Sequence, residues 1–287
     1  MPVDEDKYPT GSGRRRFVKG VVGSAALGTV AVGTGASINA ATSPTGTGGG
    51  ATEFVGIENT EGPAPRGLPI IPIRIENGEL KGMWPSVEQR ESGGITFMVA
   101  EEEVGGFLYS SSWFQYCGVQ QYKGAQPDAD ADNVFRSKAG SFDWQGDVEA
   151  GAPLEVSMFD DYEEWGNGIG TAGIGKPAGA DWRTTEEGRP LPVEILRSPE
   201  VSRMANGEGP YSSIPGEVRS FVQAATAEDF IAYLAKCTHF CCVPGFKKYP
   251  GSEKFGAEND VYCPCHQSIY DPLSPVKKQF TALPRPE

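Results

Sequence analysis

Histidine is almost absent from this sequence, since the 287 residues contain only two. Both of them, His239 and His266, lie in one short region that also holds five of the six cysteines. A histidine-based catalytic triad elsewhere in the chain is therefore excluded. All the imidazole chemistry that the chain can offer falls within residues 237–270.

An excess of basic residues is also lacking, because 25 Lys and Arg face 38 Asp and Glu, a net charge of −13. The first 19 residues carry five basic and three acidic groups (+2), which leaves −15 for the rest. Nucleic-acid binding needs clustered Lys and Arg, so no nucleic-acid partner is expected. Salt screens such an acidic surface, which favours a salt-adapted, halophilic source.

Charged residues are missing altogether from Gly20 to Thr52. The stretch follows Arg14-Arg15-Arg16-Phe17-Val18-Lys19, which matches the twin-arginine export pattern. We therefore expect residues 1–19 to be a cytoplasmic n-region and residues 20–41 to be a transmembrane anchor or signal helix. A bilayer-spanning helix needs about 20 residues.

The basic flank predicts an N-terminus inside and the remaining domain on the extracytoplasmic face of the plasma membrane. Cleavage near Ile38-Asn39-Ala40 is the alternative to a retained anchor. Residues 42–52 (TSPTGTGGGAT) are expected to be a flexible hinge with a root-mean-square reach of roughly 18 Å.

The rest of the chain is rich in Gly (38) and Pro (23), which suits short strands joined by turns. Residues 70–84 predict a strand, an Asn-Gly turn and a return strand. Further strands are expected at 95–100, 154–159, 193–197 and 230–235, and a helical turn at 220–227. The fold class is predicted to be mainly antiparallel β.

Two motifs in this part are discounted. Gly168, Gly170 and Gly173 have the spacing of a dinucleotide fingerprint, but no apolar strand precedes them. The alternating Asp128, Asp130 and Asp132 lack the Gly and Glu of a calcium-binding loop, so a solvated acidic loop is expected.

Two short segments carry the chemistry. The first is Cys237-Thr238-His239-Phe240-Cys241-Cys242, and the second is Cys263-Pro264-Cys265-His266-Gln267-Ser268-Ile269-Tyr270. Each offers one thiolate and one imidazole close together, which suits two loops that converge on one metal centre. A single Zn²⁺ with two Cys and two His is the competing interpretation, but it leaves the additional Cys of each segment unexplained.

The two segments resemble the Rieske signature, Cys-Thr-His-x-Gly-Cys and Cys-Pro-Cys-His-x-Ser. The resemblance implies one [2Fe–2S] cluster per chain, with Cys237 and Cys263 on one iron and His239 and His266 on the other. It also implies a disulfide between Cys242 and Cys265. Rieske clusters have reduction potentials of about −150 to +300 mV.

Ser268 and Tyr270 stand where Rieske proteins of quinol-oxidising cytochrome bc-type complexes have hydroxyls that donate hydrogen bonds to the cluster and a ligand thiolate. The resemblance implies a Rieske-type antiparallel β-sandwich in residues 53–287, with a cluster-binding subdomain at about 228–275.

Three features depart from that pattern. Cys241 replaces the usual Gly, and Gln267 stands where a Gly is common. The chain ends at residues 283–287, where relatives have a Gly-Pro-x-Pro loop and closing strands, so the sequence is truncated or the base domain closes differently. Cys117 and Cys241 are left over, either as two buried thiols or as a second disulfide.

The function implied by the resemblance is electron transfer from membrane quinol to a haem c or blue-copper acceptor, with His266 meeting the quinol. The chain would be the electron-carrying subunit of a quinol:cytochrome c-type oxidoreductase beside a cytochrome b-type membrane subunit. The alternative is a Rieske subunit of another exported oxidoreductase, of the arsenite oxidase type, or a ferredoxin-like carrier.

Overall fold

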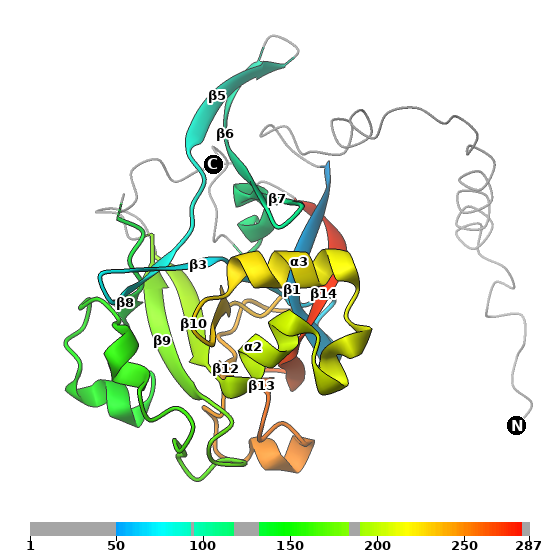
Figure 1. The fold of residues 1–287 in the computed structure, drawn as a ribbon. Coiled ribbons are helices and arrows are strands. Elements are labelled where there is room, and N and C mark those ends of the chain that lie inside the picture. Colours follow the sequence, from blue (N-terminus) through cyan, green and yellow to red (C-terminus); the bar gives the residue numbers. More distant parts are fainter. Residues whose placement is uncertain (1–49, 93–94, 118–131, 184–189, 283–287) are drawn as a thin grey trace, which may run out of the picture. The chain divides into compact units, whose positions relative to one another are not determined.

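The structure, a computed structural model, describes residues 50–92, 95–117, 132–183 and 190–282 (Figure 1). The expected n-region and anchor, most of the hinge, and Asp128 and Asp130 lie outside the described residues. Among the helices of the described ranges, none has the length and apolar character needed to cross a membrane.

The described part of the chain is mainly β, and its strand pairs are antiparallel. The strands are β1 (Gly50–Glu61), β2 (Leu68–Ile71), β3 (Ile73–Glu76), β4 (Glu79–Gly82), β5 (Val87–Ser92), β6 (Ile95–Val104), β7 (Phe107–Ser110), β8 (Arg136–Ser137), β9 (Lys176–Trp182), β10 (Leu191–Arg197), β11 (Phe230–Leu234), β12 (Gly245–Phe246), β13 (Val261–Cys263) and β14 (Ser268–Ala282). The predicted fold class is confirmed at this level.

Within the described residues, nine strands form one sheet in the order β12-β13-β14-β1-β2-β11-β10-β9-β8. β2 is the junction, because it pairs with β1 on one side and with β11 on the other. β1 and β14 run side by side as the longest pair, from Gly50↔Ala282 to Glu61↔Ile269 (Figure 1). The first segment with candidate ligands leads from β11 to β12, the strand at one edge of this order. The second segment connects β13 and β14, the next two strands from the same edge.

The last three residues of the expected hinge belong to a strand, because β1 begins at Gly50. Gly50, Ala51 and Thr52 pair with the last residues of β14. Thr52 is buried, so these three positions belong to the sheet rather than to a free tether.

The hairpin predicted around Asn77-Gly78 is present as β3 and β4. Both turn residues have positive φ, 54° and 86°, which is the conformation that an Asn-Gly turn adopts readily. The strands expected at 95–100, 193–197 and 230–235 are likewise confirmed as β6, β10 and β11.

The strand expected at 154–159 is wrong, since Val156–Phe159 forms the 3₁₀ helix η6. Leu154 does exchange backbone hydrogen bonds with Phe135 and Leu80, and Glu155 bridges to Glu79. The extended stretch therefore lasts only to Glu155, after which the chain turns to bury Phe159.

The α-helices α2 (Pro199–Asn206) and α3 (Gly216–Ala225) lie side by side (Figure 1). α3 confirms the helix predicted near 220–227, although it begins four residues earlier. α2 is missed by the sequence reasoning, although Ser198 caps its start, Pro199 stands in its first turn, and Gly207 ends it in the left-handed conformation. The remaining helices of the described residues are short 3₁₀ turns, η4 (Ser111–Phe114), η5 (Asp143–Asp147), η7 (Gly209–Ser213) and η8 (Ser252–Phe255).

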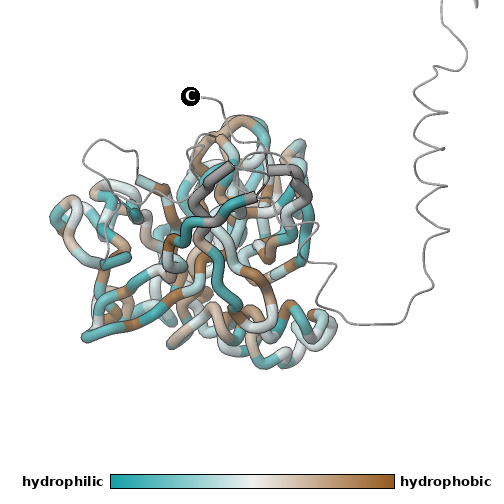
Figure 2. Tube along the Cα trace, turned by 90° about the horizontal axis from the view of Figure 1, so that it is seen from above, coloured by the Kyte–Doolittle hydropathy of each residue, from teal (hydrophilic) through white to brown (hydrophobic). Residues whose placement is uncertain are grey.

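The core is built from strand faces and aromatic rings. β11 is buried at all five positions, as its continuous apolar run FIAYL requires. Trp113, Phe114 and Trp182 are almost fully buried and pack against neighbouring aromatic rings. Figure 2 shows hydrophobic and hydrophilic positions interleaved along the chain, as expected for elements with one face in the core.

Candidate metal centre

The first candidate loop connects β11 to β12. The amide of Cys237 donates to the carbonyl of Cys242 (2.8 Å), and the amide of Cys241 donates to the carbonyl of Cys237 (3.0 Å). Cys241 has a φ of 65°, in the left-handed region. These bonds fold the loop into a tight turn that buries Cys237 and leaves His239 partly exposed.

The second candidate loop connects β13 to β14 and has the same construction. Cys263 pairs with Ser268 across the hairpin, and the amide of Gln267 donates to the carbonyl of Cys263 (3.0 Å). Gln267 has a φ of 61°. Cys241 and Gln267 thus occupy equivalent positions, each four residues after a candidate ligand and each left-handed, which explains why a glycine suits both sites.

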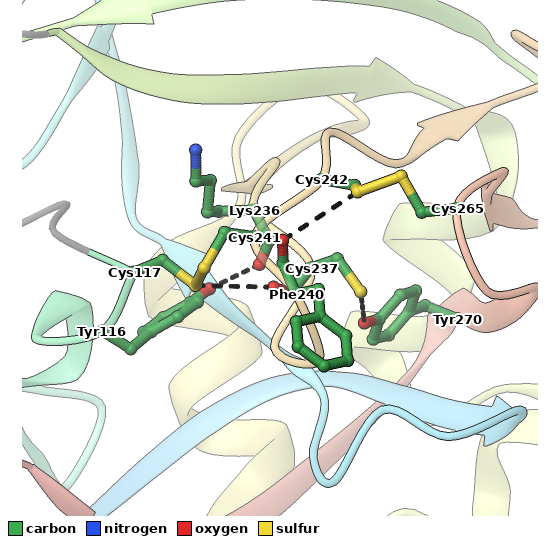
Figure 3. Close-up of a disulfide and its surroundings, with 9 residues drawn as sticks. All are labelled: Tyr116, Cys117, Lys236, Cys237, Phe240, Cys241, Cys242, Cys265 and Tyr270. Atoms are coloured by element: carbon green, nitrogen blue, oxygen red, sulfur yellow. Dashed lines mark hydrogen bonds between the residues drawn. A yellow bond between two sulfur atoms is a disulfide. The ribbon is translucent and has the colours of Figure 1, made fainter.

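Two thiols remain free among the described cysteines, those of Cys237 and Cys263, and both are buried. They are hydrogen-bonded to each other, which lowers the pKa of Cys237 and raises that of Cys263. The Tyr270 hydroxyl donates to the Cys237 sulfur at 3.2 Å (Figure 3). Burial raises the pKa of Tyr270, so its hydroxyl keeps the proton that it donates.

The two imidazoles are neighbours, with His239 and His266 ring centroids 4.7 Å apart and ring planes at 81°. The Nδ1 atom of His239 is buried and has no hydrogen-bond partner. Buried ring nitrogens are normally satisfied by a hydrogen bond or a metal. His266 is exposed, and the ring of Phe240, itself 65% exposed, lies 5.1 Å from it.

Two disulfides flank the first loop, one on each side (Figure 3). Cys242 is bonded to Cys265, which joins the two loops as the resemblance implies. Cys117 is bonded to Cys241, so the second of the two alternatives for these cysteines is the one that the structure contains. The adjacent residues Cys241 and Cys242 therefore tie one turn to two different parts of the chain.

The Cys263 sulfur lies within 4.8 Å of the Cys242 and Cys265 sulfurs. These three atoms are close enough to surround an ion. However, the bond between Cys242 and Cys265 uses both of their sulfurs, so this trio is not a ligand set. The available thiolates are those of Cys237 and Cys263.

The segment Gly62–Arg66 covers both loops, and the sequence reasoning did not find it. The Arg66 carbonyl accepts from the Thr238 hydroxyl (2.7 Å), and the Ala64 amide donates to the hydroxyl oxygen of Ser268 (3.2 Å). Gly62 has a φ of 83°, and a Cβ there would meet the Gln267 carbonyl oxygen at 2.6 Å. The sequence Gly62-Pro63-Ala64-Pro65 has the Gly-Pro-x-Pro pattern that the resemblance leads one to expect after the second loop. This pattern was the one sequence feature that could have pointed to the segment.

A buried carboxylate links β12, the strand that follows the first loop, to β10 and β11. Glu194 on β10 accepts from the Tyr233 hydroxyl (2.6 Å) and from the Phe246 amide (2.7 Å) with one oxygen. Burial raises the pKa of Glu194 to about 7, against the opposing effects of these two bonds and of Lys248. Glu194 thereby holds β12 against β10 and β11.

The glycine run and, of the three alternating aspartates, only Asp132 lie in the described residues. Gly168 and Gly170 have positive φ and open no helix, and Gly170 packs against Glu258 and Asn259. Asp132 pairs with Arg136 at 2.7 Å.

The structure places the four residues predicted as ligands on two disulfide-linked loops, with the thiols of Cys237 and Cys263 hydrogen-bonded to each other and the rings of His239 and His266 4.7 Å apart. These residues fit a metal centre that is bound by two thiolates and two imidazoles. The two thiols are buried and free, the two imidazoles are adjacent, and one imidazole nitrogen has no hydrogen-bond partner. No family model matches this chain, and neither a curated protein nor a solved structure matches it.

Proposed function

We propose that this chain is a Rieske-type electron carrier whose [2Fe–2S] cluster is held by Cys237 and Cys263 on one iron and by His239 and His266 on the other. The observation that supports the proposal is the pairing of two buried free thiols with two adjacent imidazoles on disulfide-linked loops. The antiparallel sheet would then be a Rieske-type base domain, with the loops at its edge.

When bound, the cluster supplies reversible one-electron chemistry at a potential raised by its neutral His ligands. The residues around it stabilise negative charge. Tyr270 donates to the Cys237 sulfur, and backbone amides of His239 and Phe240 lower the pKa of the same thiol. Ser268 is fully buried and accepts from Ala64, so its hydroxyl hydrogen is available to a sulfur of the bound group.

His266 is the residue that would meet the quinol. It is exposed, and one ring nitrogen remains for a hydrogen bond when the other binds iron. The exposed ring of Phe240 beside it offers an apolar surface for the quinol ring. The quinol would give one electron to the cluster and its hydroxyl proton to that ring nitrogen of His266, in the form of the ligand that has first lost its own proton there.

The acceptor of that electron would be a haem c or blue-copper protein, and a cytochrome b-type subunit would take the second electron from the quinol. Residues 20–41 would hold the chain in the plasma membrane, with the cluster domain on the extracytoplasmic face. The chain would thus be one subunit of a quinol-oxidising oxidoreductase.

The test is metal analysis of the full chain purified from membranes. Iron and acid-labile sulfide are expected in equal amounts, about two of each per chain. Cys237→Ser should abolish both, whereas Arg197→Gln, a change on β10 opposite Phe230 and away from both loops, should leave them in place. Stoichiometric zinc without sulfide would contradict the proposal.

The partner is tested by what purifies with the chain. Haem b in the complex supports the quinol-oxidising assignment. A molybdenum subunit in its place would show the arsenite oxidase type of assembly and overturn the cytochrome b part of the proposal.

A further inference from the structure

Arg66 carries a positive charge and contacts the first loop of the candidate metal centre through its backbone. Its guanidinium carbon lies 3.9 Å from the centroid of the Phe280 ring and 4.8 Å from that of Tyr116. Its carbonyl accepts from Thr238, the residue between the candidate ligands Cys237 and His239. The backbone of Arg66 therefore contacts the first loop while its side chain is held between two aromatic rings.

The Arg66 charge has no acidic partner in the described part of the chain. None of the ion pairs there involves Arg66, and its Nε atom is buried without a hydrogen-bond partner. Burial lowers the pKa of the guanidinium, whereas Tyr116 and Tyr270 raise it. Because arginine is ordinarily protonated far above neutral pH, the group remains a cation.

Both tyrosines that raise the pKa of Arg66 also form hydrogen bonds at the first loop. The Tyr116 hydroxyl donates to the carbonyl of Lys236 (2.9 Å), immediately before Cys237. The Tyr270 hydroxyl donates to the Cys237 sulfur itself. Arg66 is half-buried among groups that contact the first loop, so solvent screens its charge less than it would a charge at the exposed His266.

We propose that Arg66 is a positioning residue that raises the reduction potential of the metal centre by stabilising its reduced state. The inference rests on the proposed function. Accepting one electron makes the site more negative by one charge, while Arg66 itself gains no electron and moves no proton. A half-buried cation held between two rings favours that change, so its field acts on the potential without contacting the reacting atoms.

The experiment compares the potentials of the cluster-loaded wild type, Arg66→Gln and Arg66→Lys. Neutralising the charge should lower the equilibrium constant for reduction about tenfold, which is 59 mV for a one-electron couple. Arg66→Lys keeps the charge and should stay within twofold of the wild type. The g-values in electron paramagnetic resonance should not change in either variant, because the hydrogen bond from the Thr238 hydroxyl to the backbone carbonyl of residue 66 persists.

Arg197→Gln is the matched control. Arg197 also lies between two aromatic rings, with its guanidinium carbon 4.5 Å from the Tyr162 centroid and 5.0 Å from that of Phe230. It pairs with Phe230, at the end of β11 away from Cys237. Its substitution should leave the potential unchanged.

An equilibrium constant for reduction in Arg66→Gln within twofold of the wild-type value would overturn the inference. An equally large fall of that constant in Arg66→Lys would overturn it too. If Arg66→Gln cannot be loaded, Arg66→Met replaces it. Loss of the cluster from both neutral variants but not from Arg66→Lys still shows that the charge is needed, whereas loss from all three makes the residue structural. An iron-free wild type would instead refute the proposed function, before any potential is compared.

Discussion

Removing the disulfide between Cys117 and Cys241 should destabilise the protein strongly. The two cysteines are 124 residues apart, and closing a loop of that length in the unfolded chain is worth about 5 kcal/mol at 25 °C. The disulfide between Cys242 and Cys265 closes a separate loop with a separation of 23 residues, so its contribution is retained. We expect Cys117→Ser/Cys241→Ser to lower the free energy of unfolding by up to that amount.

The variant Cys117→Ser/Cys241→Gly separates the cross-link from the backbone strain. Cys241 has a φ of 65°, a conformation that costs a residue with a Cβ roughly 1 kcal/mol relative to glycine. The glycine variant should therefore recover about 1 kcal/mol of the loss.

The assay is urea unfolding of the purified protein, followed by far-ultraviolet circular dichroism, with the visible absorption of the proposed cluster recorded in parallel. Non-reducing peptide mapping of the wild type establishes that the bond is present. A loss smaller than 1 kcal/mol in the serine variant, or free thiols at both positions in the wild type, would refute the reasoning.

Two further predictions concern single side chains. The folded-state pKa of Glu194 is raised to about 7 from its ordinary 4.5, so its contribution to stability is fully present below pH 4.5 and is lost as the pH rises through 7. Because the carboxyl is fully buried, the free energy of unfolding should fall by roughly 3 kcal/mol over this pH range. In Glu194→Gln, the free energy of unfolding measured between pH 4 and 8 should lack this decrease. A decrease that persists in the variant would place its origin elsewhere. Tyr270→Phe removes the donor to the Cys237 sulfur and should lower the reduction potential by roughly 40 mV, equivalent to about 1 kcal/mol; an unchanged potential in a redox titration would show that this hydrogen bond does not favour the reduced state.

Residues whose local pattern decides their structure could be predicted from the sequence. Asn77-Gly78 specifies its turn, and the apolar run of β11 specifies a buried strand, so both were found. The extended stretch at Leu154 was predicted too long, because burial of Phe159 turns the chain after Glu155. α2 was missed although Ser198, Pro199 and Gly207 mark its ends, because only eight residues lie between the caps.

The candidate ligands could be found because they sit in two short segments with distinctive spacing. What the sequence could not show is the contribution of distant residues. Gly62–Arg66 lies some 170 residues before Thr238, and Cys117 lies 124 residues before Cys241. These contacts follow from the pairing of β1 with β14 and from the course of the chain after η4, neither of which has a local sequence signal.

The central claim is tested most directly by low-temperature electron paramagnetic resonance during a redox titration of the purified full chain. A rhombic signal with an average g below the free-electron value, titrating in the upper part of the range of about −150 to +300 mV, is the predicted result. An iron-free protein with no signal would contradict the account, and a signal at the bottom of the range would keep the cluster but contradict quinol oxidation.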